Sequence, residues 1–250
     1  MIVFGYLLAL GIGILLGLLG GGGSILTLPV LVYVLHFEAG VAVPMSLAVV
    51  GVTSAFGAWS HHRQGNIRWD AALAFGPAAI AGAFAGARVA TFLADRTQLL
   101  IFAVLMLGAA LSMYFGPTRG RAAPEGGPPA PRSRVAVALL GAAIGFLTGL
   151  VGVGGGFMYV PALVLLGGMA MKQAIGTSLV LIIMSCIAGF AGYLGRIDLD
   201  WTATGTFTLL AVVGVLSGSR LAGKVPQAAL RKGFAAFLLL MGIVVLLRAR

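Results

Sequence analysis

The sequence predicts an all-α polytopic membrane protein made of two homologous repeats, which we expect to be inverted relative to each other. Three observations carry this prediction: the hydropathy of the whole chain, a repeat between its halves, and a glycine cluster in the first apolar segment of each half. Of the 250 residues, 60% are hydrophobic and only 9% are charged, whereas soluble domains carry about 25% charged residues. With a mean hydropathy of +1.09, the chain has lipid as its main solvent, and a soluble fold is excluded.

Eight apolar stretches are candidates for membrane spans, which need about 20 residues each. They are Ile2–His36, Val41–His62, Ala71–Leu93, Leu99–Phe115, Val135–Leu166, Gln173–Leu194, Trp201–Leu221 and Leu230–Leu247. Between the fourth and the fifth, the residues are rich in Pro, Gly and Arg, which is typical of a flexible linker. We therefore expect a first membrane repeat at residues 1–116, a linker at 117–134 and a second membrane repeat at 135–250.

The two halves align without a gap at an offset of 132 positions (149 − 17). The matched positions include residue types that chance apolar similarity does not bring into one register. The pairs are Gly17 and Gly149, Gly20 and Gly152, Gly22 and Gly154, Gly23 and Gly155, Pro29 and Pro161, Ser46 and Ser178, Gly57 and Gly189, Trp69 and Trp201, Gly82 and Gly214, Gly86 and Gly218, and Arg88 and Arg220. Duplicated membrane halves are a feature of transporters.

The first segment of each half is too long for one ordinary span and carries a glycine cluster followed by a proline. The clusters lie at residues 20–24 and 152–156, and the prolines are Pro29 and Pro161. Because each glycine lowers helix stability by about 1 kcal/mol, we expect each repeat to begin with a helix hairpin that is broken at its glycines. The alternative is a single long, tilted helix with a glycine-rich packing face.

This choice also decides the orientation of the halves. A single crossing makes the halves parallel and divides the 16 basic residues nine to seven between the two sides. A segment that doubles back makes the halves inverted and divides them eleven to five, which agrees better with the excess of Lys and Arg in cytoplasmic loops. The inverted arrangement places the linker in the cytoplasm and both termini outside, although Arg248 and Arg250 oppose it.

Each glycine cluster lies where a helix would restart, and a restarting helix exposes free N–H groups and the positive end of its dipole. Such an N-terminus binds anions without a charged side chain, and glycines let a ligand reach the backbone. Ser24 adds a hydroxyl to the first cluster. The candidate substrate-binding residues at the two breaks are Gly22, Gly23, Ser24, Gly154, Gly155 and Gly156.

Further candidates lie on the helices that follow. Ser46, Thr177 and Ser178 carry hydroxyls that either face the ligand or cap their helix. Arg88 and Arg220 lie near helix ends, where they either balance an anion or extend to the lipid headgroups.

His61 and His62 end the second apolar stretch. We interpret them as loop histidines at the membrane interface, with a proton relay as the alternative. All acidic residues lie at span ends or in the linker, so no carboxylate is expected in the middle of the membrane.

Other classes of function find little support. The hydrolase and zinc-protease motifs are absent, and three histidines with one cysteine predict neither a metal site nor a cofactor. No basic stripe with interleaved aromatics indicates nucleic-acid binding. The expected partners are a small anionic substrate and the lipid bilayer, and the pattern selects no oligomeric state.

The chain resembles the sulfite exporter TauE/SafE family of bacterial membrane proteins. The resemblance rests on the duplicated Gly-x-Gly-Gly-Gly-x4-Pro segment, the run Ala174–Leu179 and the Gly-x3-Gly-x-Arg pattern that ends at Arg220. It covers the chain except the linker, and it departs at residues 43–46, where Val-Pro-Met-Ser replaces Ile-Gly-Thr-Ser. The resemblance implies a multi-pass transporter of the bacterial inner membrane that exports small sulfur-containing anions, such as sulfite or an organosulfonate like sulfoacetate. The alternatives are an anion channel, an intramembrane enzyme and an assembly protein.

Overall fold

The structure, a computed structural model, is entirely helical over the residues that it describes, which are 2–19, 24–115, 134–152, 155–193, 199–222 and 225–248. The helices of the first half are α1 (Ile2–Leu19), α2 (Ser24–Tyr33), α3 (Ala39–Arg63), α4 (Trp69–Ala90) and α5 (Asp95–Phe115). Those of the second half are α6 (Arg134–Val151), α7 (Gly156–Pro161), the π-helical turn η2 (Ala162–Leu166), α8 (Met171–Tyr193), α9 (Trp201–Ala222) and α10 (Gln227–Arg248). Arg134, which we assigned to the linker, is the first residue of α6.

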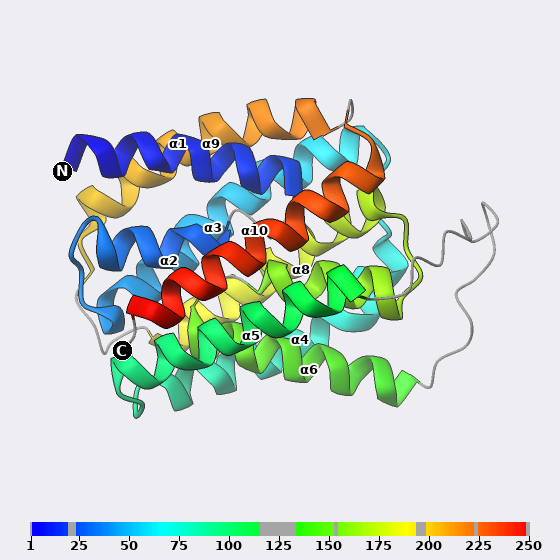
Figure 1. Cartoon of the computed structure of the whole chain (residues 1–250). Helices are drawn as coiled ribbons and strands as arrows, with labels where there is room; N and C mark the ends of the chain where they lie inside the picture. The colour runs from blue at the N-terminus through cyan, green and yellow to red at the C-terminus, as the bar shows by residue number, and fades with distance from the viewer. Residues whose placement is uncertain are drawn as a thin grey trace.

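The helices run along one common direction and form layers (Figure 1). Helices α1 and α9 pack together on one side, α4 and α6 pack together on the other, and α3 and α8 lie between these pairs. Helices α5 and α10 form a further contacting pair. The start of α1 and the end of α10 lie at one end of the bundle, whereas α5 ends and α6 begins at the opposite end. We call this opposite end the linker end.

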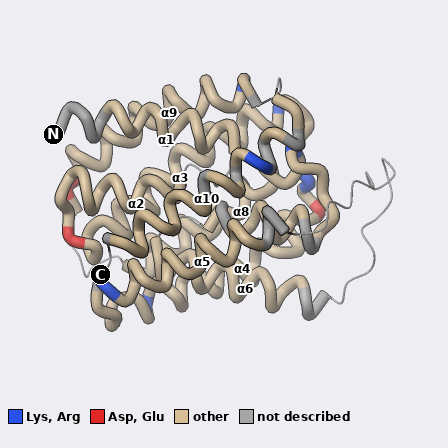
Figure 2. Tube along the Cα trace, in the orientation of Figure 1, with Lys and Arg blue, Asp and Glu red and all other residues tan. Residues whose placement is uncertain are grey.

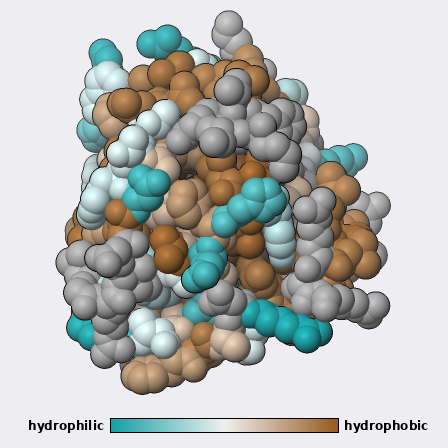
Figure 3. Space-filling model, turned by 90° about the vertical axis from the view of Figure 1, so that its left-hand side faces the viewer, coloured by the Kyte–Doolittle hydropathy of each residue, from teal (hydrophilic) through white to brown (hydrophobic). Residues whose placement is uncertain are grey.

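The outside of the bundle matches a lipid environment. Within the described part of the chain, four helices are long and apolar enough to cross a membrane, namely Ala39–Arg63, Trp69–Ala90, Met171–Tyr193 and Trp201–Leu221. Large apolar side chains such as Leu73 and Leu209 are 68% and 71% exposed. Charged residues of the described part lie toward the two ends of the helices, as Figure 2 shows. The view onto the end where α1 begins shows hydrophilic side chains around apolar ones (Figure 3).

All three tryptophans of the chain lie exposed near helix ends. Trp59 and Trp69 lie on either side of the α3–α4 connection, and Trp201 begins α9 at the opposite end of the bundle. Tryptophan concentrates at the two membrane–water interfaces. The positions of these side chains therefore indicate where the bilayer begins and ends along the bundle.

Glycines bring the backbones of the two halves into direct contact. A Cβ atom added at Gly13 on α1 would collide with the Ala211 carbonyl on α9, and one added at Gly145 on α6 would collide with the Ala79 carbonyl on α4. These two contacts are related by the offset of 132 positions. The same relation joins Gly17–Val215 with Gly149–Ala83, Gly82–Ala142 with Gly214–Leu10, and Gly86–Phe146 with Gly218–Ile14. Small residues at such helix crossings are typical of membrane proteins.

The first segment of each half consists of two helices rather than one. Helix α1 ends at Leu19 and α2 begins at Ser24, while α6 ends at Val151 and α7 begins at Gly156. The structure thus has the glycine breaks that the sequence predicts, and the alternative of a single long helix is wrong. The second copy is the more irregular one, because α7 passes after Pro161 into the π-helical turn, in which the Gly167 N–H donates to the Ala162 carbonyl over 3.0 Å.

Candidate functional site

The break between α6 and α7 is built on two glycines in the left-handed region. Gly152 has φ +74° and Gly155 has φ +64°, a conformation that L-residues with a side chain rarely adopt. The carbonyl of Gly155 accepts the N–H groups of Met158 and Tyr159 at 2.9 and 3.0 Å, which starts the new helix. A Cβ atom at Gly155 would also collide with the Thr148 hydroxyl. Glycine is therefore required at Gly155 both by the backbone conformation and by the space available.

Ser46 connects this break to the other half of the chain. It lies buried on α3, and its hydroxyl donates a hydrogen bond to the Gly152 carbonyl. A Cβ atom at Gly152 would collide with the Val43 side chain, one turn earlier on α3. The structure therefore brings Ser46 to the break on which Gly155 and Gly156 lie, three of the residues that we predicted. It does so through a contact between residues 106 positions apart.

A pair of hydroxyl groups that the sequence did not predict lies beside this break. The Tyr159 hydroxyl on α7 and the Ser185 hydroxyl on α8 are 2.6 Å apart, and both side chains are fully buried. Tyr159 also interacts with Thr148, whose own hydroxyl donates to the Ile144 carbonyl at 2.8 Å. A tyrosine one helical turn after Gly155, in an otherwise apolar segment, was the available sequence signal.

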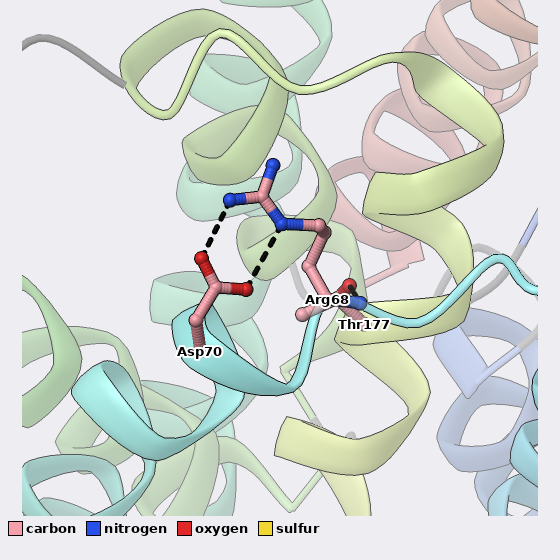
Figure 4. Close-up of polar contacts among 3 residues, drawn as sticks. All are labelled: Arg68, Asp70 and Thr177. Atoms are coloured by element: carbon pink, nitrogen blue, oxygen red, sulfur yellow. Dashed lines mark hydrogen bonds and ion pairs between the residues drawn. The ribbon is translucent and has the colours of Figure 1, made fainter. Parts of the chain in front are cut away.

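Thr177 and Ser178 form structural contacts in the structure. The Thr177 hydroxyl accepts the backbone N–H of Arg68 at 2.9 Å, as Figure 4 shows. At the neighbouring Gly176, an added Cβ atom would collide with the Asn66 carbonyl. The first turns of α8 thus form a notch that receives the α3–α4 connection, next to the Arg68–Asp70 ion pair. Ser178 donates to the Ile175 carbonyl of its own helix at 2.8 Å.

The side chains of Arg88 and Arg220 lie on the outside of the bundle. Both are exposed, and the Arg88 guanidinium lies 5.3 Å from the ring centre of Phe84. Arginines near helix ends reach the lipid headgroups in this way. Their position favours that alternative over a role next to the substrate.

The two histidines at the end of α3 differ. His62 is exposed and packs edge-on against Trp69, with 5.7 Å between ring centres, but it belongs to α3 rather than to a loop. His61 lies within α3, is only 1% exposed, and places Nε2 3.3 Å from the Gly17 carbonyl. Its interpretation as a loop residue is wrong, because the helical period turns it inward. At the offset of 132 positions, the Tyr193 hydroxyl contacts the Gly149 carbonyl at 3.2 Å.

Four predicted substrate-binding residues remain, three at the first glycine break and one at the second. Gly22, Gly23 and Gly154 lie outside the described residues. Ser24 is the first residue of α2 and is fully buried. Among the described residues, no three His, Cys, Asp or Glu side chains lie together in a way that could hold a metal ion.

Comparison with known proteins gives one family and several relatives. Residues 6–245 match the family described as "Sulfite exporter TauE/SafE". A "Probable membrane transporter protein" of Xylella fastidiosa (strain Temecula1) is 33% identical over 226 residues, which cover 84% of this chain and 81% of the relative. The "Probable membrane transporter protein YdhB" of Bacillus subtilis is 28% identical over 222 residues, which cover 88% and 90%. No solved structure matches the chain.

The match extends over nearly the whole chain, including both glycine breaks and all the helices described above. The relatives are named as membrane transporters, and the family is one of transporters rather than enzymes. The helices place the polar contacts inside the bundle and apolar side chains on its outside, as a multi-pass membrane protein requires. The chain belongs to the sulfite exporter TauE/SafE family.

Proposed function

We propose that the chain exports a small sulfur-containing oxyanion, sulfite or an organosulfonate such as sulfoacetate, through a central site between two inverted repeats. The observation that carries the proposal is the break between α6 and α7, which is buried under α3 of the other half and surrounded by neutral hydroxyls. Ser46, Thr148, Tyr159 and Ser185 are the hydroxyl residues around it. Neutral donors suit a carrier, because the anion must also be released.

The inverted arrangement is supported by the directions of the helices. Helix α1 starts at the end of the bundle opposite to the start of α6 (Figure 1). Backbone contacts between α1 and α9 recur between α6 and α4 at an offset of 132 positions. A twofold axis in the membrane plane, which relates inverted repeats, would produce both features.

In this proposal, backbone N–H groups at the two breaks bind the anion. They are those of Gly22, Gly23, Gly154, Gly155 and Gly156. Ser24 lies at the first break, and Ser46 holds the second one against α3. Thr177 and Ser178 act indirectly, through the notch that positions α8.

The membrane is the bacterial inner (plasma) membrane, with the linker at 117–134 on the cytoplasmic side. The charges of the described residues support this orientation, because basic side chains are more frequent toward cytoplasmic ends. Arg63, Arg68, Lys172, Arg220 and Lys232 lie toward the linker end, whereas Arg88 and Arg96 lie toward the other end.

Export in this orientation needs no coupling ion. The described carboxylates Glu38, Asp70 and Asp200 lie at helix ends rather than in the middle of the bundle. An inside-negative potential favours the exit of an anion by about 2.3 kcal/mol per unit charge per 100 mV. This corresponds to a gradient of about 50-fold for a monoanion at 100 mV.

Proteoliposomes with a clamped potential and no pH gradient test the proposal. We expect efflux of sulfite or sulfoacetate that follows the potential and is absent in liposomes without protein. The His61→Tyr variant serves as the control for proton coupling, because Tyr193 occupies the equivalent place at Gly149. If flux appears only with a pH gradient and is abolished by His61→Tyr, export is coupled to protons and is not driven by the potential alone.

A further inference from the structure

Four elements that carry hydroxyl groups meet in the middle of the bundle. Helix α2 contacts α3 and α7, α7 contacts α8, and α3 contacts α8. The α3–α8 crossing is close, since a Cβ atom added at Gly51 would lie 3.2 Å from the Cys186 Cβ atom. Gly51 is the central residue of the 25-residue helix α3. Residues beside this crossing are therefore far from both ends of the bundle.

Many serines and threonines of the described helices follow one rule. In membrane helices a hydroxyl usually donates to a carbonyl three or four residues earlier. The described residues that do so include Thr53, Thr148, Ser178, Thr204, Thr206, Thr208, Ser217 and Ser219. Thr27 on α2 and Ser54 on α3 do not, although both side chains are fully buried, and neither hydroxyl has a hydrogen-bond partner.

The offset of 132 positions shows what Thr27 lacks. Thr27 corresponds to Tyr159, which is long enough to reach the Ser185 hydroxyl. The position that corresponds to Thr148 is Leu16, which offers no polar atom. At the second break, Tyr159 and Ser185 therefore satisfy each other, whereas the Thr27 hydroxyl has no partner in the first half.

Ser54 follows directly after a hydroxyl residue that is bonded within its own helix. Thr53, which corresponds to Ser185, donates to the Val49 and Val50 carbonyls of its own helix at 2.7 and 3.1 Å. The Val50 carbonyl, four residues before Ser54, accepts from Thr53, whereas the Ser54 hydroxyl has no partner. The hydroxyl of Ser54 lies one turn from Gly51, on the helix that crosses α8.

A buried hydroxyl without a partner destabilises a protein and is uncommon in native structures. Of the two hydroxyls here, one lies on α3 beside its central crossing with α8, the other lies on α2, which packs on α3, and together they indicate a ligand that supplies acceptors. We propose that Thr27 and Ser54 are specificity-determining hydroxyl donors for the transported substrate, an oxyanion with several acceptor oxygens. This inference rests on the proposed function and places the substrate nearer to the first half. Ser46 and Ser178 are already bonded to carbonyls.

The test compares variants that delete only a hydroxyl, in the full chain purified in detergent. Isothermal titration gives the Kd for sulfite, sulfoacetate and sulfate. For the anion that the wild type binds, we expect Thr27→Val and Ser54→Ala to raise the Kd about 10- to 100-fold, as expected when a hydrogen bond to a charged acceptor is lost. Thr53→Val is the matched control, because it deletes the adjacent hydroxyl, which is bonded within α3. It should leave the Kd unchanged.

Thermal unfolding without ligand separates a binding role from a structural one. Because the two hydroxyls have no protein partner, Thr27→Val and Ser54→Ala should keep or raise the unfolding midpoint. Ser54→Cys, which copies Cys186 at the equivalent position, is a second variant that should fold and bind weakly.

A lowered midpoint without ligand would reveal a structural partner and overturn the inference. Wild-type Kd values in Thr27→Val and Ser54→Ala would also overturn it, leaving the proposed function intact and indicating buried water. A wild-type chain that binds none of the three anions would overturn the proposed function, and the inference with it.

Discussion

At Ser46, one hydroxyl group joins the two halves of the chain. Ser46→Ala removes the donor to the buried Gly152 carbonyl, and an unpaired buried group costs about 1–3 kcal/mol. We expect a lower unfolding midpoint in detergent and reduced transport. Ser217→Ala is the control, because Ser217 is exposed and bonds within its own helix. Equal midpoints for both variants would show that Ser46 does not hold the break in place.

Gly155 and Gly168 allow the effect of conformation to be separated from the effect of space. Both have positive φ, +64° and +66°, but an added Cβ atom collides with Thr148 only at Gly155, while Gly168 faces open space. The left-handed conformation alone costs about 1–2 kcal/mol for a residue with a side chain. We expect Gly168→Ala to lose about this much stability and Gly155→Ala to lose more, together with anion binding. Thr148→Ala should restore part of the additional loss, which a double-mutant cycle measures.

At the scale of the helices, Gly11 and Gly13 on α1 make a matched pair. An added Cβ atom has nothing within 4 Å at Gly11 but collides with the Ala211 backbone at Gly13. Since overpacking costs about 1–3 kcal/mol, Gly13→Ala should lower the unfolding midpoint. Gly11→Ala should leave it unchanged or raise it, because alanine is the better helix former.

The equivalent contact between α6 and α4 allows the cost of an added Cβ atom to be measured at a second position. Gly145→Ala should cost about as much as Gly13→Ala, because its Cβ atom would meet the Ala79 backbone. Thermal unfolding followed by size-exclusion chromatography measures both. A large cost at one position and none at the other would contradict the equivalence of the two halves.

At the scale of the whole molecule, the orientation in the membrane is testable by cysteine labelling. The single cysteine is buried beside Gly51, so a Cys186→Ala background should fold and carry no thiol. In intact cells, an impermeant reagent should label Ile2→Cys and miss Pro128→Cys if the linker faces the cytoplasm, as we propose. Labelling of Pro128→Cys, with Ile2→Cys protected, would reverse this orientation.

The sequence predicted the helices and both breaks because hydropathy and glycine clusters are local signals. It did not predict the role of Thr177, because the partner of this residue is the Arg68 N–H, 109 positions away. The Tyr159–Ser185 pair was missed for the same reason, as its members lie on different helices. Burial of His61 depends on which face of α3 meets α1, and a helix that is apolar on all sides does not reveal that face.

The pairing of α1 with α9 has a consequence for how the chain enters the membrane. The ribosome adds Ala211 198 residues after Gly13 (211 − 13). At roughly 5–20 residues per second, this is a delay of about 10–40 seconds. Until then the glycine face of α1 can meet only lipid, or some other protein that shields it. Helix α6, by contrast, finds α4 already inserted as soon as it emerges. During insertion the two halves therefore differ, although their final contacts are alike. Helix α1 is the one that an insertase would have to hold.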